Sequence, residues 1–214
     1  MISKPFDPGV WSMPPAIPTL PADTIHLWRL RLDRTFLRPL RETLAACEAV
    51  QAERLPTEID RRRFISGCGQ LREILGLYLG MSAEEVPLGY GLSGEPATIR
   101  SRHNLFFDFA RAGNLGLLAV SRIHNVTVEL ESVCGDIPFE LLADHFLEPR
   151  ENWDLRTTPR LEQLKEFFRT WTGREAIRRA GEASADVRQV VPDEGFVAAV
   201  AAEGEDWKVD CWEW

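Results

Sequence analysis

The chain has 214 residues, of which 44% are hydrophobic and 27% are charged, and its formal net charge is −8. This length suits one large domain or two small ones, and the composition is that of an ordinary globular protein. The acidic balance argues against a general nucleic-acid binder, because no basic surplus exists to neutralise phosphates. It leaves room for a local basic pocket that binds one phosphorylated ligand.

The start of the chain and the cysteines point to the cytoplasm. Residues 1–22 contain six prolines and no continuous apolar segment, which predicts an extended arm and not a secretory signal. The four cysteines have no metal-binding spacing, so we expect free thiols in a reducing compartment. No apolar run approaches the length that spans a membrane.

The remaining chain alternates between strand-like and helix-like patterns. Runs of alternating or continuous apolar residues predict strands at 25–33, 103–109, 115–121, 126–131, 196–202 and 207–212. Apolar residues at helical spacing predict helices at 37–54, 60–79, 138–147 and 160–180. A glycine-rich turn is expected at 89–96, and polar loops at 148–159 and 181–194. Because only four residues separate 115–121 from 126–131, these two strands are expected to form a hairpin.

These elements interleave without a strict β-α repeat, so the predicted fold class is α+β. We expect a proline-rich N-terminal arm and two subdomains, with bounds at 1–22, 23–112 and 113–214.

One acidic residue interrupts an apolar helix face. Leu161, Leu164, Phe168 and Trp171 follow each other at steps of three and four residues, and the next step reaches Glu175. A lone buried carboxylate is costly, so Glu175 should have a partner, and the arginines at 178 and 179 flank the same face. The site hypothesis is a carboxylate and two guanidiniums that serve a metal ion and a phosphate. The alternative is a capping box, in which Thr172 and Glu175 open a new helix and the arginines are solvated.

Two further carboxylates share one face of a strand. Glu129 and Glu131 lie two residues apart, so both side chains point to the same side of the strand 126–131. Together with Glu175 they would suit Mg²⁺, which prefers carboxylate oxygens, water and phosphate. The alternative is an exposed sheet face decorated with glutamates.

Several of these segments together resemble one known family. The segment 167–179 reads F-F-R-T-W-T-G-R-E-A-I-R-R, and T-V-E-L-E occupies 127–131. They are similar to the W-x-x-K-E-A-x-x-K and G-V-D-I-E motifs of the 4′-phosphopantetheinyl transferases of the larger, surfactin-synthetase-activating type. The segments 61–78 and 115–121 are similar to the R-R-F helix and the A-L-L-A-V-S strand of that family. The resemblance covers about residues 25–180.

The resemblance implies two pseudo-symmetric α/β subdomains with coenzyme A bound in the cleft between them. Members of the family use Mg²⁺ and transfer the 4′-phosphopantetheine arm of coenzyme A to a serine of an acyl or peptidyl carrier protein. A divergent member dedicated to one carrier protein of natural product biosynthesis is the implied function, with no role for nucleic acid or membrane. The alternatives are a relative that binds coenzyme A or a carrier protein without transfer, and a scaffold reused for other chemistry on a carrier-bound substrate.

The resemblance also implies roles for individual residues. Glu129, Glu131 and Glu175 would be the metal carboxylates, and Glu175, or a water it orients, would be the base for the carrier serine. Arg179 would contact the pyrophosphate as the second catalytic residue, and Arg63 would hold a phosphate of coenzyme A. The remaining cofactor-binding positions implied by the resemblance are Gly94, Glu95, Pro96, Arg111 and Arg174.

This sequence departs from the family motifs at several of these positions. In the family motif F-N-x-S-H-S, alanines stand for both serines at 110 and 112, and Arg111 stands for the histidine. Arginine still binds phosphate, bidentately and without titrating. In the family motif G-K-P, Glu95 stands for the lysine and reverses its charge. Glutamate at 129 and arginines at 174 and 179 keep the charge of the family residues and change the geometry.

Overall fold

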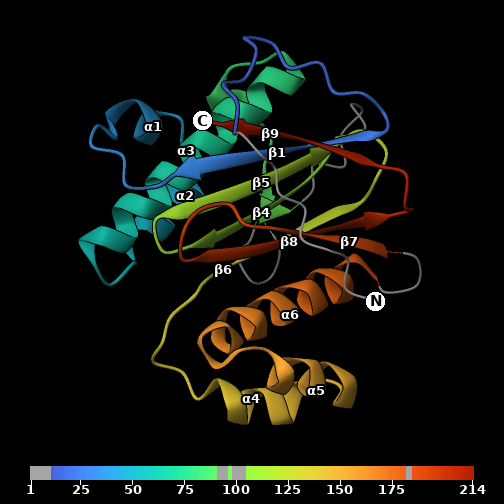
Figure 1. The fold of residues 1–214 in the computed structure, drawn as a ribbon. Coiled ribbons are helices and arrows are strands. Elements are labelled where there is room, and N and C mark those ends of the chain that lie inside the picture. The colour runs from blue at the N-terminus through green and yellow to red at the C-terminus, as the bar shows by residue number, and fades with distance from the viewer. Residues whose placement is uncertain (1–10, 91–95, 98–104, 182–184) are drawn as a thin grey trace.

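The computed structural model describes residues 11–90, 96–97, 105–181 and 185–214. In these ranges the chain forms two larger sheets with helices on their outer faces (Figure 1). A short pair of strands, β2 (Gly89–Tyr90) and β3 (Pro96–Ala97), lies in the predicted glycine-rich turn. The α+β class predicted from the sequence is confirmed.

The first sheet has four strands in the order β4-β5-β1-β9. Its strands are β1 (Thr24–Arg31), β4 (Phe106–Ala112), β5 (Leu115–Ser121) and β9 (Lys208–Glu213). The pair β4-β5 is an antiparallel hairpin whose turn contains Gly113 at a φ of 54°, which favours glycine. β9 pairs in parallel with β1, although about 180 residues separate the two strands along the chain. The sheet therefore joins residues from both of the predicted subdomains.

The second sheet has three antiparallel strands in the order β6-β8-β7. Its strands are β6 (Val126–Ser132), β7 (Ala185–Val190) and β8 (Phe196–Glu203). β6 follows β5 directly but belongs to the other sheet, so the hairpin predicted between these two strands is wrong. The apolar residues of β5 and β6 contact each other face to face in the core, and residues 122–125 carry the chain from one sheet to the other.

The main apolar core lies between the two sheets. Leu115, Leu117 and Ala119 of β5 pack there against Val128 and Val200 of the second sheet. The alternate residues of β5 face the helix α3 (Glu58–Leu79), and this explains why the whole of β5 is buried. On the outer face of the second sheet, the helix α6 (Arg160–Ala180) packs against β8 and β7 (Figure 1).

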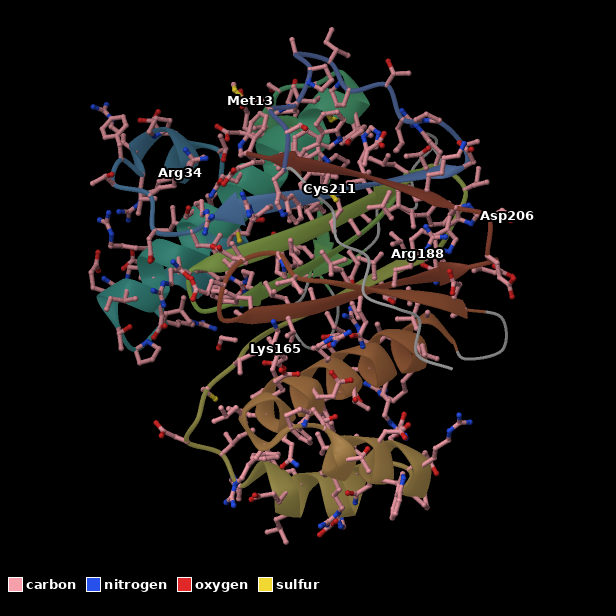
Figure 2. The ribbon with its side chains drawn as sticks, viewed as in Figure 1. Met13, Arg34, Lys165, Arg188, Asp206 and Cys211 are labelled. Carbon is pink, nitrogen blue, oxygen red and sulfur yellow. The ribbon has the colours of Figure 1, made fainter. Side chains whose placement is uncertain are left out.

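The smaller helices lie outside these layers. They are α1 (Arg38–Glu42), α2 (Ala46–Glu53), the 3₁₀ turn η1 (Ala83–Glu85), α4 (Phe139–Phe146) and α5 (Pro149–Thr157). α1 and α2 pack on α3, whereas α4 and α5 pack on α6 (Figure 1). The thiols of Cys47, Cys68, Cys134 and Cys211 are free, as expected, and Cys211 lies buried on β9 (Figure 2).

Three further local predictions are corrected by the structure. The helix predicted at 37–54 is two helices, because Ala45 is extended and its N–H donates to the Glu48 side chain at 2.6 Å to open α2. The loop predicted at 148–159 contains α5, which Pro149 begins and Glu151 caps by accepting from the Glu148 N–H. The loop predicted at 181–194 contains β7. This strand has only six residues and few of them are apolar, so the sequence pattern does not indicate a strand there.

Candidate active site

The last two turns of α6 carry three of the side chains singled out in the sequence. Thr172 lies in the middle of α6, where its hydroxyl donates to the Arg169 carbonyl, so the alternative of a capping box that opens a new helix is wrong. Ala176 faces the second sheet and is fully buried, which leaves Glu175 and Arg179 at the edge of that contact. Arg178 donates from Nε and Nη2 to Oε2 of Glu175 at 3.0 and 2.8 Å.

The apolar face predicted for α6 is partly correct. Phe168 is buried and Leu164 packs against the same cluster, whereas Leu161 is 98% exposed at the beginning of the helix. Glu175 is half-buried, and Arg178 is its partner. The expectation that Glu175 has a cationic partner is therefore confirmed.

The glutamates of β6 face α6 and not open solvent. Thr127, on the same face of the strand, donates its hydroxyl proton to the Ala176 carbonyl at 2.9 Å, which fixes the orientation of this face. Nη1 of Arg179 donates to Oε1 of Glu129 at 2.7 Å and to the Val128 carbonyl at 3.2 Å. Both Glu129 and Glu131 are half-buried, so the alternative of an exposed glutamate-decorated sheet face is wrong.

One cavity brings the three predicted metal carboxylates together. Its volume is about 490 Å³, and its walls come from β4, β6 and α6. The lining residues are Phe109, Ala110, Arg111, Glu129, Leu130, Glu131, Glu175, Arg178 and Arg179. We call it the acidic cavity. Acidic and guanidinium groups from three elements that are distant in sequence thus line one cavity.

Arg111 connects this cavity with a second one. Its guanidinium lies over the Phe64 ring of α3, 5.1 Å from the ring centre. The second cavity has a volume of about 270 Å³, and Arg63, Phe64 and Arg111 are among its lining residues. Arg63 donates from Nε to Oδ1 of Asp33 at 2.8 Å. Arg63 and Arg111, both predicted to bind coenzyme A, therefore line neighbouring cavities. Arg111 lines both of them, and Arg63 lines only the second.

The other predicted cofactor-binding positions lie elsewhere. Arg174 is turned toward α5, where Nη1 donates to Glu151 at 2.6 Å and Nη2 to Glu148 at 3.5 Å, and it does not line the acidic cavity. Pro96 lies in the short strand β3. Gly94 and Glu95 lie outside the described residues. The assignments of these four positions stay predictions.

Asp108 of β4 bonds one of the arginines that line the acidic cavity, and the sequence prediction missed it. Its Oδ1 accepts from Nη2 of Arg179 at 2.9 Å, and its Oδ2 accepts from the Val128 N–H at 2.8 Å. A carboxylate between the apolar residues 107 and 109 was a signal that this position needs a partner. The partners lie 20 and 71 residues away, so local patterns do not identify them.

The electrostatics of the acidic cavity follow from burial and from these pairs. Burial raises the pKa of Glu129, and the hydrogen bond from Arg179 opposes that rise. Burial, followed by the charge of Glu129, raises the pKa of Glu131. Burial disfavours the charged form of Arg179, but Asp108 and Glu129 together hold its pKa above the ordinary value. Among the described residues, no cation is bonded to Glu131.

The donor chemistry of this cavity suits a hard divalent cation. Across the described ranges, no three Asp, Glu, His or Cys side chains are placed closely enough to hold one ion, so ligation by all three glutamates stays a prediction. Mg²⁺ does not need such a set, because it is usually bound by one or two carboxylates with water and substrate phosphates. Glu129 and Glu131, on one face of one strand, supply such a pair.

The pKa of Glu131 leads to a prediction for stability. Because its pKa is raised above the ordinary value of 4.5, the folded protein holds this proton more tightly than the unfolded chain does. The free energy of unfolding therefore falls as the pH rises through the folded pKa, and Glu131→Gln removes this loss. We expect Glu131→Gln to raise Tm without metal, and by more at about pH 8 than at about pH 5. Thermal unfolding of both proteins at the two pH values measures this; an equal gain at both would contradict it.

The cavity thus combines paired carboxylates, the groups that bind hard divalent cations, with guanidiniums, the groups that bind phosphates. No family model matches the chain. It is 33% identical to the 4′-phosphopantetheinyl transferase HetI of Nostoc sp., over 95% of this chain and 98% of that protein. It is also 29% identical to slr0495 of Synechocystis sp., over 80% of this chain and 71% of that protein, whose description as a 4′-phosphopantetheinyl transferase is provisional. The chain belongs to the 4′-phosphopantetheinyl transferase family.

Among the helices described, none combines the length and the apolar character that crossing a membrane requires.

Proposed function

We propose that the protein transfers the 4′-phosphopantetheine arm of coenzyme A to a serine of an acyl or peptidyl carrier protein in a reaction that depends on Mg²⁺. Membership of the transferase family supports this proposal. The observation that carries the metal-dependent chemistry is the acidic cavity itself, in which Glu129, Glu131 and Glu175 lie with Arg111, Arg178 and Arg179. We further propose a cytoplasmic protein that serves one carrier of a natural product pathway.

Within this cavity the carboxylates have different roles. Glu129 and Glu131 would hold Mg²⁺, which when bound supplies positive charge beside the pyrophosphate of coenzyme A. Glu175 is the base: both hydrogen bonds from Arg178 go to Oε2, and no described residue bonds Oε1. Glu175 takes the proton of the carrier serine hydroxyl, directly or through a water.

The bond changes follow from the substrate. The serine oxygen forms a bond to the phosphorus that carries the pantetheine arm, and the bond from this phosphorus to the bridging oxygen breaks. Adenosine 3′,5′-bisphosphate leaves with the electron pair. Transfers of this type depend mainly on positioning and charge neutralisation, which fits a site built from arginines and carboxylates.

The arginines bind the charged parts of coenzyme A. Arg179 contacts the pyrophosphate from α6, and Arg178, whose pair with Glu175 is largely exposed, is available to a phosphate oxygen. Arg111, between the two cavities, and Arg63, in the second cavity, bind the phosphates farther along the molecule. The segment 94–96 would contact the adenine side, as in the family motif.

A mass-spectrometric assay tests the proposed function. The protein is incubated with coenzyme A, Mg²⁺ and apo carrier proteins encoded near its gene, and the intact mass of each carrier is measured. We expect the mass of one phosphopantetheine group to be added, and to be lost when EDTA is present or the carrier serine is replaced by alanine. Tight binding of coenzyme A in calorimetry, with no adduct on any of these carriers, would contradict transfer and favour a protein that only binds.

A further inference from the structure

Asp108 joins the three elements that form the acidic cavity. It lies on β4 of the first sheet, accepts the backbone N–H of Val128 on β6 of the second sheet, and accepts Nη2 of Arg179 on α6. Its side chain is only 13% exposed, so both contacts are shielded from water. Among the described residues, no other carboxylate at this cavity connects both sheets and α6 through its hydrogen bonds.

The guanidinium of Arg179 is shared between two carboxylates. Nη1 bonds Glu129 at 2.7 Å, and Nη2 bonds Asp108 at 2.9 Å. A guanidinium with a single carboxylate partner would neutralise Glu129 and repel a cation approaching it. With Asp108 as a second partner, the trio carries one net negative charge, and a cation that replaced Arg179 at Glu129 would leave Arg179 bonded to Asp108.

We propose that Asp108 is a positioning residue for the proposed metal site: it holds Arg179 by one nitrogen, so that Glu129 is free to bind a divalent cation and Arg179 remains beside the pyrophosphate. This inference rests on the proposed function. Asp108 itself does not line the acidic cavity, and it acts through Arg179 and Glu129. Residues with this kind of indirect contact to a metal typically change its affinity by about 10- to 100-fold when they are replaced.

The test replaces the charge of Asp108 and measures the metal alone. In Asp108→Asn, the amide has one acceptor oxygen, so it keeps either the Val128 N–H or the guanidinium but not both. Mn²⁺ serves as a spectroscopic substitute because it shares the preference of Mg²⁺ for oxygen ligands. We expect Asp108→Asn to weaken Mn²⁺ binding about 10- to 100-fold, measured by the electron paramagnetic resonance of free Mn²⁺ without coenzyme A.

A matched control exists outside the acidic cavity. Asp193 also pairs with an arginine of another element, Arg31, and accepts a backbone N–H, that of Glu194, but it lies outside the acidic cavity. Asp193→Asn makes the same chemical change, and we expect it to leave Mn²⁺ affinity unchanged. Equal losses in both variants would indicate a general effect of the substitution and overturn the proposal.

A second variant of Asp108 separates charge from shape. Asp108→Glu keeps the negative charge but adds a methylene, whereas Asp108→Asn keeps the shape and removes the charge. A positioning role predicts that Asp108→Glu binds Mn²⁺ more tightly than Asp108→Asn. A purely structural role predicts the reverse order, and that order overturns the proposal.

Wild-type Mn²⁺ affinity in a folded Asp108→Asn also overturns the positioning role of Asp108. The proposed function stands in that case if the wild type binds Mn²⁺ and modifies the carrier. A wild type that does neither overturns both.

Discussion

Replacing Glu131 with glutamine is expected to lower kcat/KM for pantetheine transfer by about 100- to 1000-fold, the scale seen when one group that stabilises transition-state charge is removed. Glu131 lies in the acidic cavity beside Glu129, and no described residue supplies it with a cation. Glutamine has nearly the same shape and no charge, so the loss of activity would come from the missing metal-binding carboxylate and not from altered packing. Initial rates of carrier modification at several Mg²⁺ concentrations measure the effect.

The mutation at Glu131 should separate activity from stability. The same substitution that removes activity is expected to raise Tm, as argued above from the raised pKa, because functional sites often keep a charge that costs stability. Glu205→Gln, an exposed glutamate on the turn before β9, is the control and should change neither quantity. Full activity in Glu131→Gln would show that the metal site is assigned to the wrong carboxylates.

The largest expected loss of stability comes from Arg72. Nε of Arg72 donates to both oxygens of Glu48 at 3.1 and 2.8 Å, and Nη1 donates to the Val86 carbonyl at 2.9 Å. The side chains are 3% and 0% exposed, so Arg72→Met would leave a buried carboxylate without its partner. Breaking such a pair costs about 3–5 kcal/mol of unfolding free energy. For a chain of this size, we expect Tm to fall by about 6–20 °C in a calorimetric scan.

Two further variants test the cause of that loss. Arg38 pairs with Glu42 on the surface at 3.1 Å, with the arginine 80% exposed, and Arg38→Met should change the unfolding free energy by less than about 1 kcal/mol. Adding Glu48→Gln to Arg72→Met removes the unpaired charge and should recover part of the Tm. A double variant less stable than Arg72→Met would mean that lost packing, and not the buried charge, dominates.

Much of the site could be predicted because its parts have strong local patterns. The period of two in 126–131 placed Glu129 and Glu131 on one face, and the helical spacing in 160–180 placed Glu175 at the end of a partly buried face. The continuous apolar run of β5 was also predicted with its observed bounds. Each of these features depends on neighbouring residues, which is the information that a single sequence carries best.

The parts that were not predicted depend on contacts between distant residues. The side chain of Arg179 reaches Glu129, 50 residues away, and Asp108, 71 residues away. The separation of β5 and β6 into two sheets depends on which apolar faces meet in the core, and a short connection alone favours a hairpin. α5 escaped prediction because its sequence is largely polar and its one buried apolar residue is Leu155.

The parallel pairing of β1 with β9 has a consequence for how the protein is produced. Until residues 208–213 have been synthesised, the edge of β1 that faces away from β5 has no strand to pair with. An open edge of this kind is a template for pairing between molecules, and contacts of such long sequence separation form slowly. Nascent chains should therefore be most prone to aggregate during this interval, and a chaperone that binds the unpaired edge should increase the soluble yield.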